Sequence, residues 1–131
     1  MDRRIIWMAS LFGMTAVIFG AFGAHLLKNK LGTSELVTFE TGVRYQMFHA
    51  LLLLFVGICE ISSKLRRTIF ILITLGIVLF SGSIYLLATN QLTNFDFKVI
   101  GFVTPIGGLF LIVGWAILMF HFIGKKSIKS S

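Results

Sequence analysis

Four long runs of apolar residues limit what this chain can fold into. They cover residues 5–24, 43–61, 68–89 and 99–123, and their only Asp, Glu, Lys or Arg residues are Arg44 and Glu60, near the ends of the second run. Each run has 19 to 25 residues, and a helix needs about 20 to cross roughly 30 Å of hydrocarbon. Strands of a membrane barrel are shorter and alternate in polarity. The runs therefore predict four transmembrane helices.

Composition points to the same class of protein. Hydrophobic residues make up 56% of the 131 residues and charged residues only 13%, and a soluble domain of this length could not bury so much apolar surface. We predict an all-α, integral membrane four-helix bundle that forms a single transmembrane domain over residues 1–131. Its helices are expected at about 5–25, 34–61, 68–89 and 99–123, with Thr33-Ser34-Glu35 as a hydroxyl-capped start of the second.

The first run has a second interpretation, a cleaved signal peptide. Arg3 and Arg4 form a basic start, and Ala21-Phe22-Gly23 resembles a small-x-small cleavage site. However, a signal core usually has about 7–15 apolar residues, fewer than this run contains. We therefore expect a retained helix.

The net charge of +7 is distributed as in a membrane protein rather than a nucleic-acid-binding one. With four spans, eight of the twelve basic residues fall on one side: Arg3, Arg4, Lys64, Arg66, Arg67, Lys125, Lys126 and Lys129. The other side holds Lys28, Lys30, Arg44 and Lys98. Positive residues concentrate on the cytoplasmic side, so both termini are expected there.

Small and polar residues mark the helix faces that should turn away from lipid. A packing seam on the first helix repeats at four- and three-residue intervals: Ala9, Gly13, Ala16, Gly20 and Gly23. Small residues let membrane helices approach closely. A polar stripe on the second helix consists of Gly42, Gln46, His49, Leu53, Gly57 and Glu60, and a polar face on the third of Thr74, Ser81, Tyr85 and Thr89. Pro105 is expected to kink the fourth helix.

One candidate site lies on the outer side, where the end of the first helix should meet the start of the second. The residues expected to form this polar cluster are His25, Glu40, Arg44, Tyr45, Gln46 and His49, with Glu35 nearby. For each histidine, a structural hydrogen bond competes with a role in ligand or proton handling. Burial should keep His49 neutral, so that it donates and accepts at once.

No catalytic or metal-binding motif accompanies this cluster. The sequence has no histidine pair at i, i+4 and no Cys-x-x-Cys, and its single cysteine, Cys59, excludes an intrachain disulfide. We expect no enzymatic activity, no metal and no cofactor.

Two motifs resemble a known family when taken together. "GAFGAH" at Gly20–His25 and "YQMFHAL" at Tyr45–Leu51 are similar to motifs of small bacterial four-span inner-membrane proteins classed as domain of unknown function 423. Within it, the chain resembles the membrane-stabilising protein A type of low-GC Gram-positive bacteria. The resemblance implies a multi-pass protein of the bacterial plasma membrane, but no reaction, ligand or catalytic residue.

The function expected from these features is support of membrane integrity without catalysis. Membrane lipids are the expected partners, together with either another membrane protein or further copies of this chain, and nucleic acid is not expected. A small oligomeric transporter or channel, with a polar path along the second and third helices, is the alternative. A haem or quinone carrier is disfavoured because no histidine pair faces across the bundle.

The expected topology can be tested by thiol labelling. In a variant with Cys59→Ala and Ser131→Cys, the new thiol should resist a membrane-impermeant reagent in intact cells and react after permeabilisation. Labelling in intact cells would place the C-terminus outside.

Overall fold

The computed structural model describes residues 1–124. Its main elements are helices α1 (Arg3–Phe22), α2 (Thr33–Ile58), α3 (Ser63–Ala88) and α4 (Val103–Gly124). A π-helical turn, η1 (Gly23–Leu27), extends α1, and two short 3-10 helices, η2 (Asn90–Leu92) and η3 (Phe97–Ile100), lie between α3 and α4. Counting η1 and η3, four helical segments of 25 to 28 residues are long and apolar enough to cross a membrane.

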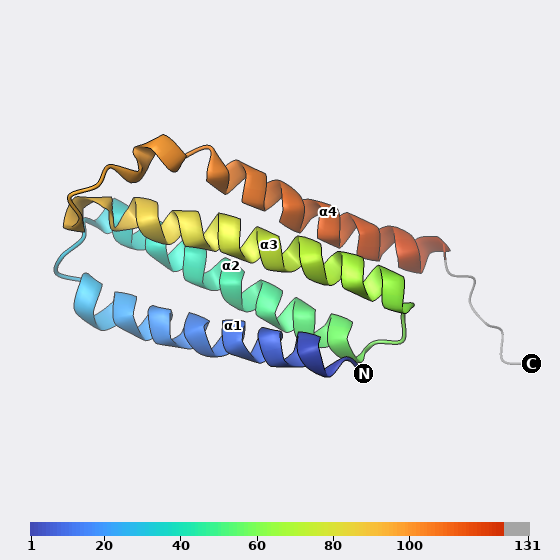
Figure 1. Ribbon diagram of the computed structural model, residues 1–131. Coiled ribbons are helices and arrows are strands. Elements are labelled where there is room, and N and C mark those ends of the chain that lie inside the picture. The colour runs from blue at the N-terminus through green and yellow to red at the C-terminus, as the bar shows by residue number, and fades with distance from the viewer. Residues whose placement is uncertain (125–131) are drawn as a thin grey trace, which may run out of the picture.

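The helices pack in chain order, with α2 and α3 between α1 and α4 (Figure 1). The most deeply buried apolar side chains come from the two inner helices: Leu53, Val56, Ile69 and Ile73 each have 0% exposure. The outer helices add fewer core residues, so α2 and α3 form the centre of the protein.

Local interactions at the helix ends explain where α1 and α3 begin. The Asp2 carboxylate accepts hydrogen bonds from the backbone N–H groups of Arg4 and Ile5, at 3.0 and 3.4 Å. The Ser62 hydroxyl accepts one from the N–H of Leu65 at 3.2 Å. These caps satisfy backbone donors that have no partner within the helix. Because Ser62 acts as a cap, α3 begins at Ser63 rather than near 68, before its apolar run.

The N-cap of α2 and the place of Pro105 within the fourth helix differ from the sequence-based expectation. Gly32 occupies the N-cap position of α2 and gives no side-chain cap, so the expected hydroxyl cap is absent. Pro105 lies in the first turn of α4, where a backbone N–H has no intrahelical acceptor and a proline removes nothing. The kink expected at Pro105 in the fourth helix is therefore absent, because Pro105 lies where the helix begins.

Glycines set the close approach of α4 to α3. A Cβ atom built on Gly107 would meet backbone atoms of α3, among them the Phe80 Cα at 2.8 Å. On Gly114 it would meet the Ile73 side chain. A membrane interface gains much of its stability from such contact, so α3 and α4 depend on the absence of side chains at these positions.

We expect Gly107→Ala to destabilise the protein by about 1–3 kcal/mol, because backbone atoms cannot yield as a flexible side chain can. The measurement is the free energy of unfolding in detergent micelles. Gly82→Ala is a matched control, since a Cβ at Gly82 meets nothing within 4 Å. Equal effects of the two substitutions would contradict this account of the interface.

Candidate functional site

The polar stripe of α2 faces the interior of the protein. Gly42, Gln46, His49, Leu53 and Gly57 are all buried. Glu60, the last residue of the stripe, is exposed and lies beyond the end of α2. Two polar side chains, those of Gln46 and His49, therefore lie buried within a span of apolar composition, where an unpaired polar group would be costly.

Gln46 joins three helices. Its Nε2 donates to the backbone carbonyl of Phe12 at 2.9 Å and to the Thr15 hydroxyl at 2.7 Å, both on α1. Its Oε1 accepts from the Tyr85 hydroxyl of α3 at 2.7 Å. Both donor hydrogens and the carbonyl oxygen of the amide are thus paired. Next to this group, Ser81 of α3 donates to the carbonyl of Gly42 at 2.7 Å.

His49 connects α2 to α4 through Nε2, while its Nδ1 pairs with the backbone of α2 itself. The Trp115 indole N–H donates to Nε2 of His49 at 3.0 Å, and Nδ1 lies 2.7 Å from the carbonyl oxygen of Tyr45. An indole can only donate and a carbonyl can only accept. This arrangement requires the neutral tautomer with hydrogen on Nδ1, since a second hydrogen on Nε2 would oppose the indole N–H.

A groove of about 310 Å³ lies beside the His49–Trp115 pair. Aromatic and apolar side chains from α2, α3 and α4 line it: Tyr45, His49, Phe80, Leu111, Ile112 and Trp115, together with Gly108. Tyr45 and Trp115 are exposed at its edge. The groove is therefore accessible from the lipid-facing side, and its polar ring nitrogens are already hydrogen bonded.

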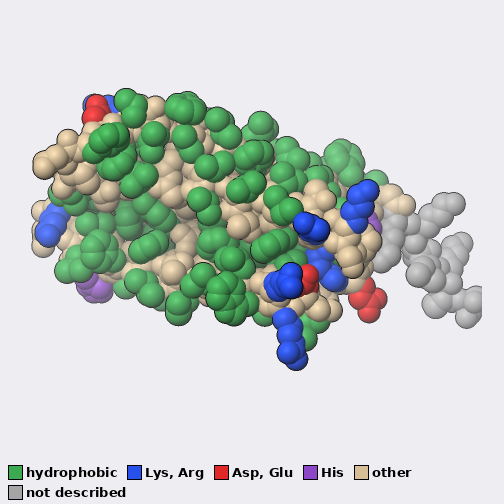
Figure 2. All heavy atoms as spheres, in the orientation of Figure 1, with side chains coloured by type: hydrophobic (Ala, Val, Ile, Leu, Met, Phe, Trp, Pro, Cys, Tyr) green, Lys and Arg blue, Asp and Glu red, His purple; other side chains and the backbone are tan. Residues whose placement is uncertain are grey.

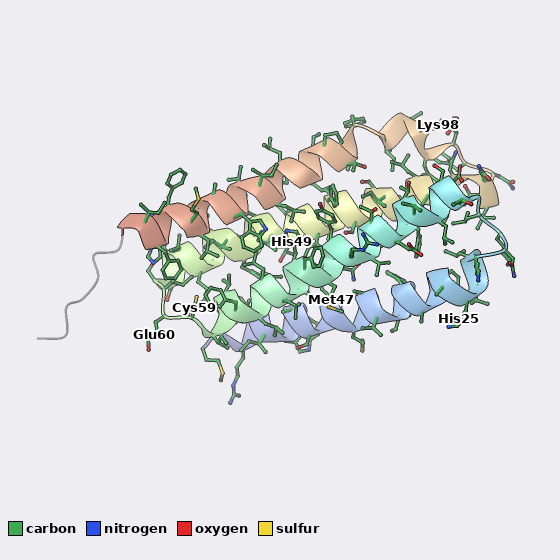
Figure 3. All side chains as sticks on the ribbon, turned by 180° about the vertical axis from the view of Figure 1, so that it is seen from behind. His25, Met47, His49, Cys59, Glu60 and Lys98 are labelled. Atoms are coloured by element: carbon green, nitrogen blue, oxygen red, sulfur yellow. The ribbon has the colours of Figure 1, made fainter. Side chains whose placement is uncertain are left out.

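The structure does not bring the six candidate residues into one cluster. His25 is exposed at the end of α1, whereas His49 lies near the middle of α2 (Figure 3). Gly23 packs against Phe39, and His49 lies ten residues further along α2, or about 15 Å. Glu40, Arg44 and Tyr45 are exposed. Gln46 and His49 alone turn inward, and they contact different helices.

The small residues of α1 lie toward α2. Ala9, Ala16 and Gly23 are buried, and Gly13 and Gly20 are half-buried. A Cβ on Gly13 would lie 3.9 Å from the Ala50 Cβ, one on Gly20 would lie 3.4 Å from Val43, and one on Gly23 would lie 3.0 Å from the Phe39 ring. The π-helical turn then breaks the regular spacing, so His25 does not continue the seam.

Two residues missing from the expected cluster complete these networks. Tyr85 belonged to the polar face expected on the third helix, but pattern alone could not pair it with Gln46. Trp115 was not among the expected site residues, although its position is unusual. Tryptophan favours the membrane interfaces, and this one lies in the middle of α4. A mid-span tryptophan indicates a partner for its N–H.

A metal site has no support within the described part of the chain. Among residues 1–124, no three His, Cys, Asp or Glu side chains come together in a way that could hold a metal ion.

Comparison with known proteins places the chain in a family. The family model described as "protein of unknown function (DUF423)" matches residues 19–108. The chain belongs to this family. It is 44% identical over 118 residues to a UPF0382 membrane protein of Staphylococcus saprophyticus, covering 89% of this chain and 94% of that protein. It is 36% identical over 123 residues to the UPF0382 inner membrane protein YgdD of Escherichia coli K12, covering 90% and 88%.

No solved structure matches the chain. The family and the four apolar helices together identify a multi-pass protein of the bacterial inner membrane. The DUF423 match includes both expected motifs and the Gln46–Tyr85 pair, whereas Phe12 and Thr15 lie before its start and Trp115 lies beyond its end.

Substitutions at His49 should distinguish a structural hydrogen bond from a role in ligand or proton handling. His49→Leu removes the acceptor of the Trp115 N–H and should destabilise the protein by about 0.5–2 kcal/mol. His49→Gln supplies an amide that both donates and accepts, so it should keep most of the stability in detergent unfolding. If both variants are as stable as the original protein, the pair does not serve to hold α2 and α4 together.

Proposed function

We propose that this protein supports the integrity of the bacterial plasma membrane without catalysing a reaction, through contacts with lipid or protein partners. The observation that supports this role is the pairing of four polar side chains in the interior of the protein. The amide of Gln46, the hydroxyls of Tyr85 and Ser81, and both ring nitrogens of His49 take part in hydrogen bonds that join helices or fix the His49 ring. Such groups stabilise a bundle rather than receive a substrate.

The outer surface favours the same role. Large apolar side chains are exposed along the length of the molecule (Figure 2), including Val17, Phe48, Ile112 and Phe120 at 62, 51, 65 and 64%. In a bilayer these side chains contact acyl chains, so the lipid contact surface is extensive.

Transport within a single copy is disfavoured by the packing of α2 and α3. Gln46 and Tyr85, which would line a path, are hydrogen bonded to each other, and Ser81 donates to the backbone of α2. Leu53, Val56, Ile69 and Ile73 have no exposed surface. A conducting path would therefore have to form between several copies.

Dye exclusion by whole cells tests the proposed role. Cells that lack the protein should admit a membrane-impermeant dye at lower detergent concentration than the parent strain. The original gene and Gly82→Ala should restore the barrier, and the destabilised Gly107→Ala variant should restore less of it. An intact barrier in the deletion strain would overturn the proposal, and ion flux through proteoliposomes of purified protein would favour the channel.

A further inference from the structure

Basic side chains crowd the end of the molecule that carries the N-terminus (Figure 2). Arg3 and Arg4 begin α1, and Lys64 and Arg67 lie in the first turns of α3; all four are exposed. Arg66 is different because it donates to the carbonyls of Val56 and Cys59, at 3.2 and 2.6 Å, and so caps the end of α2. The other four remain accessible at the edge of the apolar surface.

Two adjoining pockets open among these residues. One, of about 500 Å³, lies between the first turns of α1 and α3. Its polar lining is Asp2, Arg4, Ser63 and Arg67, and its apolar lining is Ile5, Phe70 and Ile71. The other, of about 470 Å³, is lined by Arg3, Arg4, Trp7, Met8 and Phe70. Arg4 and Phe70 line both pockets. Together they form one groove, basic at the end of the bundle and apolar toward the membrane.

The charge of this groove is strongly one-sided. Asp2 is the acidic residue among the lining groups, and its carboxylate already accepts hydrogen bonds from the backbone of Arg4 and Ile5. The guanidinium groups of Arg3, Arg4 and Arg67 outnumber it. A guanidinium binds phosphate oxygens in a planar, bidentate geometry.

We propose that this groove binds an anionic phospholipid, with its phosphate between Arg4 and Arg67 and its acyl chains against Trp7, Met8 and Phe70. A lipid is favoured over a free phosphate because the basic part continues directly into an apolar wall, and only an amphiphile covers both. Basic pockets between transmembrane helices bind anionic headgroups in this way. The site rests on the proposed function and names the lipid partner.

Lipid titration of purified protein in detergent tests the site. Phosphatidylglycerol should bind and raise the melting temperature, whereas phosphatidylcholine and soluble glycerol 3-phosphate should have little effect. The double variant R4Q/R67Q should bind phosphatidylglycerol about tenfold more weakly or worse. The control K28Q/K30Q removes two exposed charges from the loop between η1 and α2, at the other end of the molecule, and should bind as the original protein does.

Several outcomes would overturn the site. Equal affinity for phosphatidylcholine, comparable binding of glycerol 3-phosphate, or unchanged affinity in R4Q/R67Q would each do so. The melting temperature of lipid-free R4Q/R67Q shows whether that variant is folded, and Arg4→Gln alone repeats the test if it is not. Unchanged affinity of R4Q/R67Q for phosphatidylglycerol overturns the lipid site even if cells that lack the protein admit more dye. Conversely, an intact barrier in the deletion strain overturns the proposed function and leaves the binding result standing.

Discussion

The pairing of Gln46 is the interaction on which the arrangement of three helices depends. A primary amide in an apolar span must have its donors and acceptor satisfied, because no water is available to take their place. Gln46 meets this requirement with groups from α1 and α3 at the same time. The two helices consequently have to sit at fixed depth and rotation around α2. Apolar packing alone would permit sliding, since lipid is as apolar as the core.

Further hydrogen bonds join α3 to α2, α3 to α4, and α4 to α2. Ser81 bonds to the backbone of α2, and Ser83 lies 2.6 Å from the Thr104 hydroxyl of α4. The Trp115 indole N–H of α4 donates to Nε2 of His49 on α2. Glycines then allow the helices to come close enough for these short side chains to meet, as Gly42 does beside Tyr85 and Gly107 beside Phe80. Small residues and hydrogen bonds thus act together along the bundle.

The fold class could be predicted from the sequence because the length and hydrophobicity of the apolar runs depend only on composition along the chain. It also indicated the inward face of α2, since periodicity places Gln46 and His49 on one side of a helix. It could not assign their partners, because Tyr85 and Trp115 are separated from them by 39 and 66 residues. Proximity in sequence to a shared loop wrongly suggested that His25 joins them. The start of α3 at Ser63 depends on the Ser62 cap, which hydrophobicity does not reveal.

The depth of a polar group in the membrane separates the two kinds of chemistry in this protein. In the middle of the spans, Gln46, His49 and Tyr85 are hydrogen bonded to groups on other helices, so their effect is on the relative positions of the helices. At the end that carries the N-terminus, Arg4 and Arg67 face outward beside apolar side chains, and water and headgroups can compensate their charge. The "GAFGAH" segment contributes packing rather than polar chemistry, because Gly20 and Gly23 pack on α2 whereas His25 is exposed. Contact with molecules outside the bundle is therefore favoured at its basic end, where charged groups remain accessible next to lipid.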